Sequence, residues 1–504
     1  MVNVILKNED ITLKAEYGDN LYTLLSNNGI IDAPCGGKGV CGKCGVTING
    51  EFYLSCLYNI KENITVTTTA KPKIGDIVCC GYKKEIDFDK YENDMFGVSI
   101  DIGTTTLVAT LINLSNGEEI SSFSQLNSQK SYGQDVITRI NFTADNADGL
   151  QILQHTIIAD VQNLLETICK QNNITTQMID KITVGGNTTM IHLLMGVNPI
   201  SIAKAPFKPT ICGAVDVKAN SLGLNVSDNC RLYCLPSISS FVGGDITAGI
   251  LTCNLNNRKD KTLFIDIGTN GEIVLSNNGK LCCCSCAAGP ALEGMNISCG
   301  MRAAHGAIED VFIDMDNSCI NIKTIGDSTP IGVCGSGILS AIEQMNKNNL
   351  INKSGRIQNS PFTETLDNKK IFMLCKEKNI YLTQNDIRQI QLAKGAILSG
   401  IIALLNNFNL SFEDIDCIMV AGQFGAHLKA DSLVGAGLLP YKWKDKIIYV
   451  GNTSQAGAYL CLMSKNQREQ AEHLVCNAEY IELSTLKNYE KLFIDCLSFS
   501  EENK

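Results

Sequence analysis

Four cysteines in one short stretch have the spacing of a metal site. Cys35, Cys41, Cys44 and Cys56 are separated by five, two and eleven intervening residues. Three thiolates in a loop and a fourth on the hairpin that follows can hold a 2Fe-2S cluster, because its irons take four soft ligands. Glycines between the cysteines allow the sharp bends that such a loop needs. The pattern therefore predicts a 2Fe-2S site.

A zinc site with four cysteines and a set of reduced thiols are the alternatives. Zinc sites usually present two separate Cys-x-x-Cys pairs, and only Cys41 and Cys44 form such a pair here. The loop resembles a plant-type ferredoxin loop, although its first gap is one residue longer than the common spacing. Its short last gap resembles the iron-sulfur subunits of fumarate reductase and carbon monoxide dehydrogenase.

The chain has 23 cysteines, and most of them lie outside this motif. The N-terminus has acidic residues where a signal peptide would have a basic start and an apolar core. We therefore expect a cytoplasmic protein with reduced thiols rather than a disulfide scaffold. Cys282, Cys283, Cys284 and Cys286 share one predicted strand, where alternate side chains face opposite sides. We expect these four to pack in a core.

A second kind of site occurs twice along the chain. The segment VSIDIGTTT at 98–106 returns as LFIDIGTNGE at 263–272. Each copy is an apolar strand that ends in Asp, then Gly-Thr, then another strand. Such an Asp can hold hydrated Mg²⁺, and the turn offers N–H and hydroxyl groups to phosphate. The duplication resembles the superfamily of actin, sugar kinases and seventy-kilodalton heat-shock chaperones, in which ATP lies between two homologous halves.

This resemblance implies a set of ATP-binding residues. The first phosphate loop would contain Asp101, Gly103, Thr104 and Thr105. The second would contain Asp266, Gly268, Thr269 and Asn270. Two glycine turns fit the adenosine side, Gly335-Ser336-Gly337 before an apolar helix and Gly422-Gln423-Phe424-Gly425. The alternative for the Asp-Gly-Thr segments is a pair of ordinary turns capped by acids, and a GxxxxGK[ST] phosphate loop is absent from the sequence.

Asp245, in the segment FVGGDITAGI, is a candidate for the group that orients the attacking water. The superfamily often places that group between the two halves. The catalytic set implied by the resemblance is therefore Asp101, Asp266 and Asp245. A helix N-cap is the alternative role for Asp245.

The elements that position these residues divide the chain into four parts. Residues 1–70 predict a small ferredoxin domain, with strands at 2–6 and 11–15, a helix near 19–27 and a hairpin at Asn49-Gly50. Residues 71–96 are charged and predict a linker. Residues 97–260 and 261–504 predict the two ATPase halves. The expected fold class is α/β, a duplicated actin-like (ribonuclease H-like) ATPase with an N-terminal α+β β-grasp ferredoxin domain.

Composition limits the partners. The formal charge of −10 comes without a long basic run, which argues against nucleic acid. The longest apolar stretch, residues 395–405, is too short to cross a bilayer. We therefore expect proteins and small ligands as partners.

The order of motifs resembles one family over nearly the whole chain. After the cysteine loop come DIGTTT, VGGNTTM, FVGGD, DIGTNGE, AAGPALEG, CGSG, QLAKGAI, AGQFG and GNTSQAGA. This order resembles the reductive activators of corrinoid-dependent methyltransferases. The resemblance implies ATP-dependent reduction of a corrinoid protein from Co(II) to Co(I), with the electron passing through the 2Fe-2S cluster. It also implies Mg²⁺, a low-potential electron donor such as a ferredoxin or flavodoxin, and a homodimer as one arrangement.

Two departures from the family pattern and three rival functions complete the expectations. Some relatives have a sizeable linker and a middle domain between the ferredoxin and ATPase parts, whereas only about 40 residues separate Cys56 from the DIGTTT strand here. The family's mode of dimerisation is therefore not carried over to this chain. The cysteine run that holds a C-terminal cubane cluster in other relatives is also missing. The rivals are a small-molecule kinase with a redox-sensing domain, a redox-gated chaperone-like ATPase, and an activator of a radical dehydratase. The first would phosphorylate an added substrate, and in the second electrons would never leave the cluster.

Overall fold

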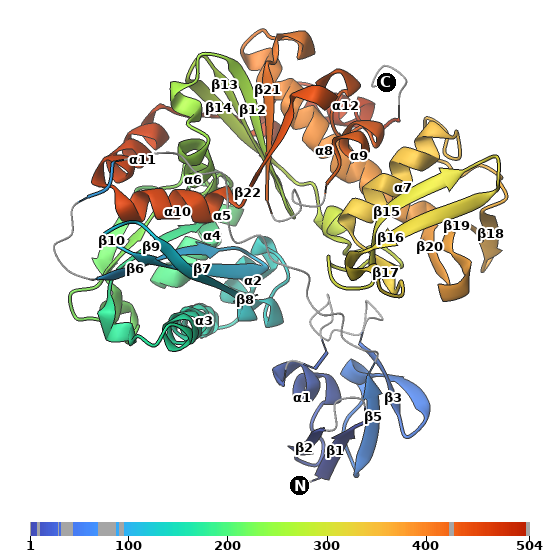
Figure 1. Ribbon diagram of the computed structural model, residues 1–504, viewed down its shortest axis with the longest axis horizontal. Coiled ribbons are helices and arrows are strands. Elements are labelled where there is room, and N and C mark those ends of the chain that lie inside the picture. The colour runs from blue at the N-terminus through green and yellow to red at the C-terminus, as the bar shows by residue number, and fades with distance from the viewer. Residues whose placement is uncertain are drawn as a thin grey trace. The chain divides into compact units, whose positions relative to one another are not determined.

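The computed structural model describes residues 2–7, 11–28, 30–31, 44–68, 87–89, 95–422 and 428–499. The chain divides into two compact units, and the N-terminal sheet belongs to the smaller one (Figure 1). The larger unit contains the two Asp-Gly-Thr segments.

The small unit is a five-stranded mixed sheet with one helix. Its elements are β1 (Val2–Leu6), β2 (Ile11–Ala15), α1 (Leu21–Asn27), β3 (Gly45–Ile48), β4 (Glu51–Leu54) and β5 (Ile64–Thr68). The strand order is β2-β1-β5-β3-β4, with β1 and β5 parallel. Asn49 and Gly50 both have positive φ, as the predicted two-residue hairpin requires. The mixed sheet and its helix have the arrangement expected of a β-grasp fold.

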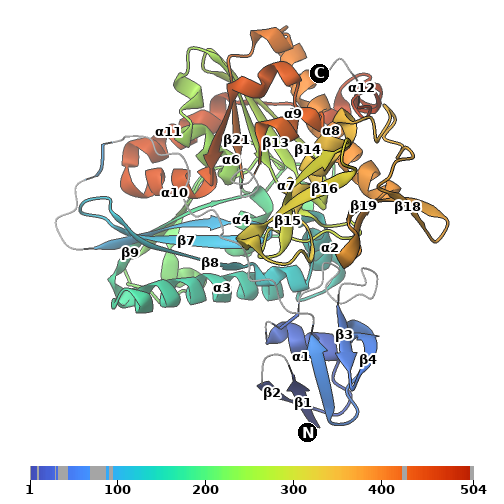
Figure 2. The same cartoon turned by 45° about the vertical axis from the view of Figure 1, so that its right-hand side comes forward.

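The first half of the large unit is built on a six-stranded sheet. Its strands are β6 (Phe96–Ile102), β7 (Thr106–Asn113), β8 (Glu119–Leu126), β9 (Ile179–Gly186), β10 (Val215–Lys218) and β11 (Arg231–Cys234). Its helices are α2 (Val136–Asp145), α3 (Gly149–Gln171), α4 (Thr188–Met195), α5 (Ile200–Ala203) and α6 (Gly244–Thr252). The long helix α3 lies along one face of this sheet (Figure 2).

The second half is built on another six-stranded sheet. Its strands are β12 (Lys261–Ile267), β13 (Gly271–Asn277), β14 (Lys280–Cys286), β21 (Cys417–Ala421), β22 (Ile447–Gly451) and β23 (Glu479–Tyr480). Its helices are α8 (Gln384–Asn407), α10 (Thr453–Met463), α11 (Lys465–Asn477) and α12 (Tyr489–Asp495). Helix α10 packs against β6 and β9 of the first sheet. Residues of α6 share a hydrophobic cluster with β12 and β21 of the second. These two helices therefore lie between the sheets.

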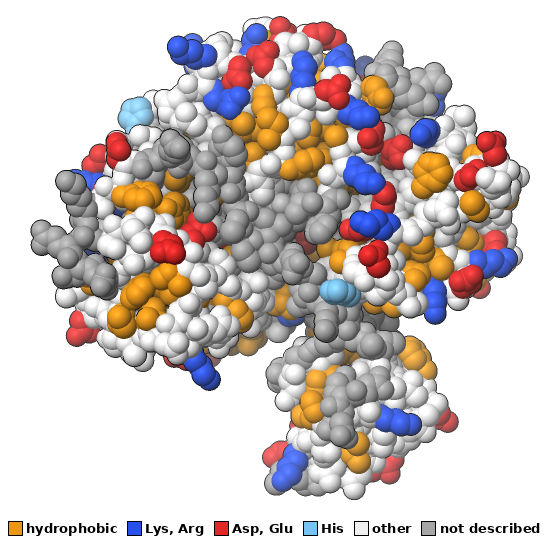
Figure 3. Space-filling model, viewed as in Figure 1, with side chains coloured by type: hydrophobic (Ala, Val, Ile, Leu, Met, Phe, Trp, Pro, Cys, Tyr) orange, Lys and Arg blue, Asp and Glu red, His pale blue; other side chains and the backbone are white. Residues whose placement is uncertain are grey.

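A smaller subdomain is inserted in the second half. It contains the three-stranded sheets β16-β15-β17 and β18-β19-β20 together with helix α7 (Figure 1). The bounds are β15 (Ala307–Asp314), β16 (Cys319–Thr324), β17 (Gly332–Val333), α7 (Gly335–Lys347), β18 (Thr363–Leu366), β19 (Lys369–Cys375), β20 (Ile380–Thr383) and α9 (Ala430–Gly435). Helix α7 packs against β15 and α9. On the face in Figure 3, lysine and arginine side chains are interspersed with acidic ones.

The two six-stranded sheets repeat one arrangement. The order β9-β6-β7-β8 in the first sheet corresponds to β21-β12-β13-β14 in the second. In both, the Asp-Gly-Thr strand is parallel to one neighbour and antiparallel to the hairpin partner that follows it. The predicted duplication is confirmed.

The cysteine-rich strand β14 packs in the interior, as predicted. Cys282, Cys284 and Cys286 face one hydrophobic cluster, and Cys283 faces another on the opposite side of the sheet. Helix α8 covers the first of these faces. By length and composition α8 could cross a membrane, but 78% of its most apolar window is buried inside the fold. It is therefore a core helix of this protein.

Candidate active site

The first Asp-Gly-Thr segment forms a tight turn between β6 and β7. Asp101 is the penultimate residue of β6, and the Gly103 N–H donates to the Thr106 carbonyl at 3.0 Å. A Cβ on Gly103 would lie 2.7 Å from that carbonyl oxygen, so glycine is required here. Thr104 and Thr105 are half-buried at the tip.

Two buried side chains, Asn127 and Arg139, hold the backbone of this turn through hydrogen bonds. Asn127 donates its amide to the Gly103 carbonyl at 2.9 Å. Arg139, which is fully buried, donates to the Thr104 carbonyl at 2.5 Å and to Gln129 at 3.1 Å. Burial lowers the pKa of Arg139 to about 10, while Asp135 and Asp160 act in the opposite direction. The guanidinium is therefore still charged at neutral pH and places a positive charge directly beneath the turn.

The second Asp-Gly-Thr segment forms the matching turn between β12 and β13. The Gly268 N–H donates to the Asn270 carbonyl at 2.9 Å, and the Thr269 hydroxyl donates to Glu293 at 2.7 Å. Gly422 has φ of +99°, and a Cβ there would lie 2.8 Å from Asp266 Oδ1. The structure thus brings Gly422 to the second phosphate loop. Gln423, its predicted partner in binding adenosine, lies outside the described residues.

Four carboxylates are electrostatically coupled at this site. Burial raises the pKa of Asp245 to about 7, with further contributions from Asp266 and Asp101. Burial and the Asp101 charge raise the pKa of Asp266 to about 7. The pKa of Glu272 lies well above its usual range because of burial and the charges of Asp245 and Asp266. Four half-buried carboxylates that repel each other in this way favour a cation among them.

Glu272 was given no role by the sequence, although it closes the quoted segment LFIDIGTNGE. Residue 272 lies directly opposite Asp266 in the β12–β13 pair, and its carboxylate accepts from Ser285 at 3.4 Å. In an antiparallel pair, opposite residues project on the same face. Antiparallel pairing of the two strands therefore gives the second loop a second carboxylate.

The second half holds Asp101 through the start of α10. Asn452 donates to Asp101 Oδ2 at 2.9 Å, and Ser454 donates to Asp101 Oδ1 at 2.7 Å. Gln455 donates to the buried Ser99 at 2.8 Å. Burial raises the pKa of Asp101, whereas the bonds from Ser454 and Asn452 lower it. These partners belong to the quoted motif GNTSQAGA, which the sequence could not connect to Asp101.

Asp245 lies in the first turn of α6 and is not its N-cap. The N-cap is Gly243, and the Asp245 carboxylate accepts from the Ile246 N–H at 2.9 Å. The alternative role as a helix cap is therefore wrong. A Cβ on Gly243 would lie 2.5 Å from Asn187 Cα and 2.8 Å from Asp245 Oδ1. The absence of a side chain at Gly243 lets the start of α6 approach the start of α4 closely.

The carboxylates fit a magnesium ion that is held mainly by other ligands. Within the described ranges, no group of three or more His, Cys, Asp or Glu side chains could hold a metal ion. Mg²⁺ is usually bound by one or two carboxylates, substrate phosphates and water. Asp101 and Asp266, one from each half, fit that mode of binding.

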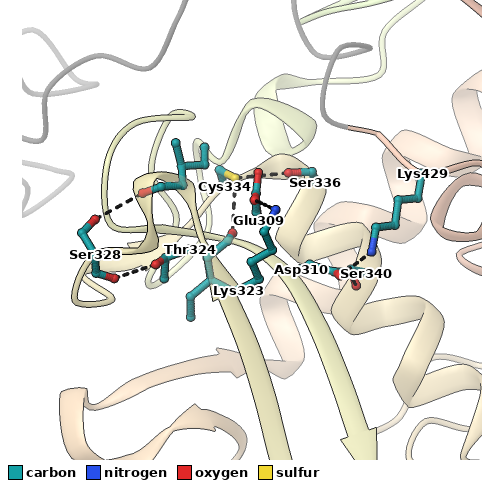
Figure 4. Close-up of polar contacts among 11 residues, drawn as sticks. Glu309, Asp310, Lys323, Thr324, Ser328, Cys334, Ser336, Ser340 and Lys429 are labelled. Carbon is teal, nitrogen blue, oxygen red and sulfur yellow. Dashed lines mark hydrogen bonds and ion pairs between the residues drawn. The ribbon is translucent and has the colours of Figure 1, made fainter.

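The predicted glycine turn at 335–337 begins α7, as expected. Ser336 is buried, and its hydroxyl lies 3.3 Å from the Cys334 thiol (Figure 4). A Cβ on Gly337 would lie 2.1 Å from the Ile308 carbonyl of β15, so close packing requires this glycine. Asp310 of β15 pairs with Lys429 and accepts from Ser340 at 2.7 Å (Figure 4). A contact of this turn with adenosine stays a prediction.

The small unit brings two predicted cluster ligands together. Cys44 lies just before β3 and Cys56 lies in the short 3-10 helix after β4 (Ser55–Leu57), and both are buried. Their Sγ atoms are 3.0 Å apart. Two converging thiols fit the donor set of an iron-sulfur cluster. Cys35 and Cys41 lie outside the described residues.

Duplicated sheets, paired Asp-Gly-Thr turns and two helices between the sheets define a protein of the actin-like, or ASKHA, class. A family model described as the C-terminal domain of RACo, the ASKHA domain, matches residues 260–504. A model described as the RACo middle region matches residues 96–258. This second match covers nearly the same residues as the predicted first half, 97–260. The chain belongs to the RACo family of reductive activators of corrinoid proteins.

Individual relatives agree with this assignment. The corrinoid activation enzyme RamQ of Eubacterium limosum is 33% identical over 79% of this chain and 70% of its own length. A reductase of the Co(II) methylated amine-specific corrinoid protein from Methanosarcina barkeri is 24% identical over 80% of this chain and 77% of its own. The solved structure of a reductive activator for corrinoid, iron-sulfur protein is 27% identical, with a TM-score of 0.74, and covers 99% of this chain and 98% of its own.

Proposed function

We propose that this chain uses MgATP hydrolysis to drive the one-electron reduction of a corrinoid protein from Co(II) to Co(I). Family membership supports the corrinoid partner, because the relatives are named for that activity. The observation that carries the ATP part is Asp101, a residue of the first loop held by Ser454 and Asn452 of the second half. A nucleotide bound between the two Asp-Gly-Thr turns would lie close to this contact of Asp101 with Ser454 and Asn452.

The residues of the site have distinct proposed roles. Asp101 and Asp266 hold hydrated Mg²⁺, and the two Asp-Gly-Thr turns bind the phosphates through N–H and hydroxyl groups. Asp245 orients the attacking water and accepts its proton, consistent with burial and neighbouring charges that raise its pKa to about 7. The turns at 335–337 and 422–423 contact adenosine. The products are ADP and inorganic phosphate.

The small unit supplies the proposed electron site. Cys35, Cys41, Cys44 and Cys56 would hold the 2Fe-2S cluster, and Cys44 and Cys56 already converge. When bound, the cluster would accept one electron from a low-potential ferredoxin or flavodoxin and give one electron to cobalt. The polypeptide contributes a buried position for two of the four thiolates.

Energetics explain why ATP is needed. Plant-type clusters lie near about −400 mV, and the Co(II)/Co(I) couple is expected to be lower. A gap of about 200 mV corresponds to on the order of 4 to 5 kcal/mol for one electron. A nucleotide that selects one of two conformations can supply free energy of that size. We infer that closure of the ATPase halves favours a corrinoid protein whose cobalt is more easily reduced.

Anaerobic visible spectroscopy tests the proposal. A Co(II) corrinoid protein is mixed with the reconstituted chain and a low-potential reductant, with and without MgATP. We expect Co(I) only with ATP, and its loss in Cys41→Ser and Asp101→Ala. If the cluster is reduced and ATP is hydrolysed while every corrinoid partner stays Co(II), the proposal fails and the kinase and chaperone functions become the ones to test.

A further inference from the structure

We propose that Asn187 is a positioning residue that turns the Thr104 hydroxyl into a hydrogen-bond donor for a phosphate oxygen. The inference rests on the proposed binding of ATP and adds a residue to that site. Asn187 belongs to the segment VGGNTTM, to which no role has been assigned above. Its backbone directly follows β9, whose last residue Gly186 is the register partner of Ile102 in β6. Parallel strands end at the same sheet edge, so Asn187 lies beside the first phosphate loop.

The orientation of the Asn187 amide is fixed by two bonds. Its Oδ1 accepts from the Met190 N–H at 3.0 Å, which makes it the N-cap of α4. Its Nδ2 therefore points the other way and donates to Thr104 Oγ1 at 3.0 Å. Because the helix needs the oxygen as an acceptor, the amide cannot flip without losing the cap.

This contact decides what the Thr104 hydroxyl can do. A hydroxyl has one donor and two acceptor positions, and Asn187 uses one of the acceptor positions. Within the described part of the chain, the Thr104 hydroxyl donates to no side chain or carbonyl, so its hydrogen is left for a ligand. Arg139 fixes the backbone at the same residue through the Thr104 carbonyl. Phosphate oxygens are acceptors only, so a preset donor is the group that they require.

The second half repeats the arrangement, which supports a role beyond capping. Asn452 also follows a strand that ends in glycine, and it caps α10 by accepting from the Gln455 N–H at 3.0 Å. Its Nδ2 also reaches the first loop, where it donates to Asp101 at 2.9 Å. Both halves thus use a Gly-Asn-Thr segment to cap a helix and to orient one group of the same loop.

Conservative variants separate positioning from capping. Asp and Ser cap helices about as well as Asn, so Asn187→Asp and Asn187→Ser keep α4. In Asn187→Asp the carboxylate accepts from Thr104 and turns its hydrogen away from the ligand. We expect the KM for ATP to rise about tenfold or more, with a smaller rise in Asn187→Ser. Thr104→Val should raise the KM to a similar extent, whereas Thr104→Ser should stay near wild type.

A double-mutant cycle removes the effect of the added charge. The negative charge that Asn187→Asp introduces repels ATP in either background, but reorientation of a hydroxyl requires Thr104. We therefore expect Asn187→Asp to raise the KM for ATP much less in a Thr104→Val background than in the wild-type background. An equal rise in KM in the two backgrounds would overturn the inference, and so would a KM for Asn187→Asp within about twofold of wild type. If the wild-type chain neither binds nor hydrolyses ATP, the proposed function itself fails, and that result is distinct from both.

Discussion

At the scale of single residues, the site holds four carboxylates close together, and burial disfavours their charged forms. Burial raises the pKa of each of the four, Asp101, Asp245, Asp266 and Glu272. Among these four, and counting donors from the described residues, only Asp101 receives two side-chain donors from the opposite half. Asp101 is therefore the carboxylate best kept ionised, and Asp245, whose pKa is raised to about 7, is the one that we propose as the proton acceptor.

Replacing Asp245 tests that division of labour. Asp245→Asn keeps the shape of the side chain but cannot accept a proton from water. We expect kcat for ATP hydrolysis to fall by a factor of about 10² to 10⁴, with a smaller change in nucleotide affinity. Phosphate release and nucleotide binding are the two measurements, and Asp228→Asn on the exposed surface is the matched control. Retained hydrolysis would point to Glu272 as the base.

Removing a donor to Asp101 tests the contact across the halves. The Ser454 bond favours the ionised form of Asp101 and lowers its pKa. Ser454→Ala therefore raises the pKa of Asp101 further, and the carboxylate becomes protonated at a higher pH. The acid limb of the pH profile of ATP hydrolysis should move to higher pH than in wild type. Ser484→Ala, in a short turn distant in sequence, is the control, and superimposable profiles for Ser454→Ala would contradict the role of this bond.

At the scale of elements, helix α8 joins the core to the C-terminal segment. Its Lys394 is fully buried, and the ammonium donates to the carbonyls of Cys496 at 2.6 Å and Ser498 at 2.9 Å. Gln391, one turn earlier, donates to the Leu497 carbonyl at 3.0 Å. The apolar face of this buried helix is thus interrupted by polar groups that hold a segment about 100 residues away.

The pH dependence of stability tests the buried lysine. Burial lowers the pKa of Lys394 from 10.5 to about 8 in the folded protein. Between these values the unfolded chain binds more protons, so the free energy of unfolding rises with pH by up to about 3 kcal/mol from this residue. Below about pH 8 this contribution is absent. Denaturant unfolding should give a higher free energy of unfolding at pH 10 than at pH 7.5 in wild type, and Lys394→Met should lack this rise. An equal rise with pH in both proteins would contradict the prediction.

At the scale of the whole molecule, chemistry is divided between two compact units. The predicted cluster ligands belong to one unit, and the paired Asp-Gly-Thr turns belong to the other. ATP hydrolysis and cluster binding should therefore be separable by mutation. Only cobalt reduction should need both.

Loss of a cluster ligand tests this separation. In Cys56→Ser we expect the visible absorption of the cluster to be lost and cobalt reduction to stop, while ATP hydrolysis stays near wild type. Cys319→Ser, at an exposed cysteine of the larger unit, should leave the cluster absorption, cobalt reduction and ATP hydrolysis unchanged. A parallel fall of ATP hydrolysis in Cys56→Ser would show that the two units are coupled even without the corrinoid protein.

Local signals were sufficient for the repeated parts of the fold. The Asn-Gly hairpin, the strands that end in Asp-Gly-Thr and the alternating cysteines of β14 are governed by turn geometry and by the period of two in a strand. These features could be read because neighbours in sequence decide them. The order of the motifs likewise identified the family without a structure.

Contacts between distant segments required the tertiary structure. Ser454 and Asn452 are 353 and 351 residues away from Asp101, so no local pattern links them. Helix α6 begins at Gly244 with Gly243 as its N-cap, so Asp245 lies two residues past the capping position. Only the tertiary structure shows where this helix begins. The amino-acid sequence determined which groups can bind a metal or a phosphate. The packing of two halves around α6 and α10 decided which of these groups meet, because close packing fixes such distances and sequence spacing does not.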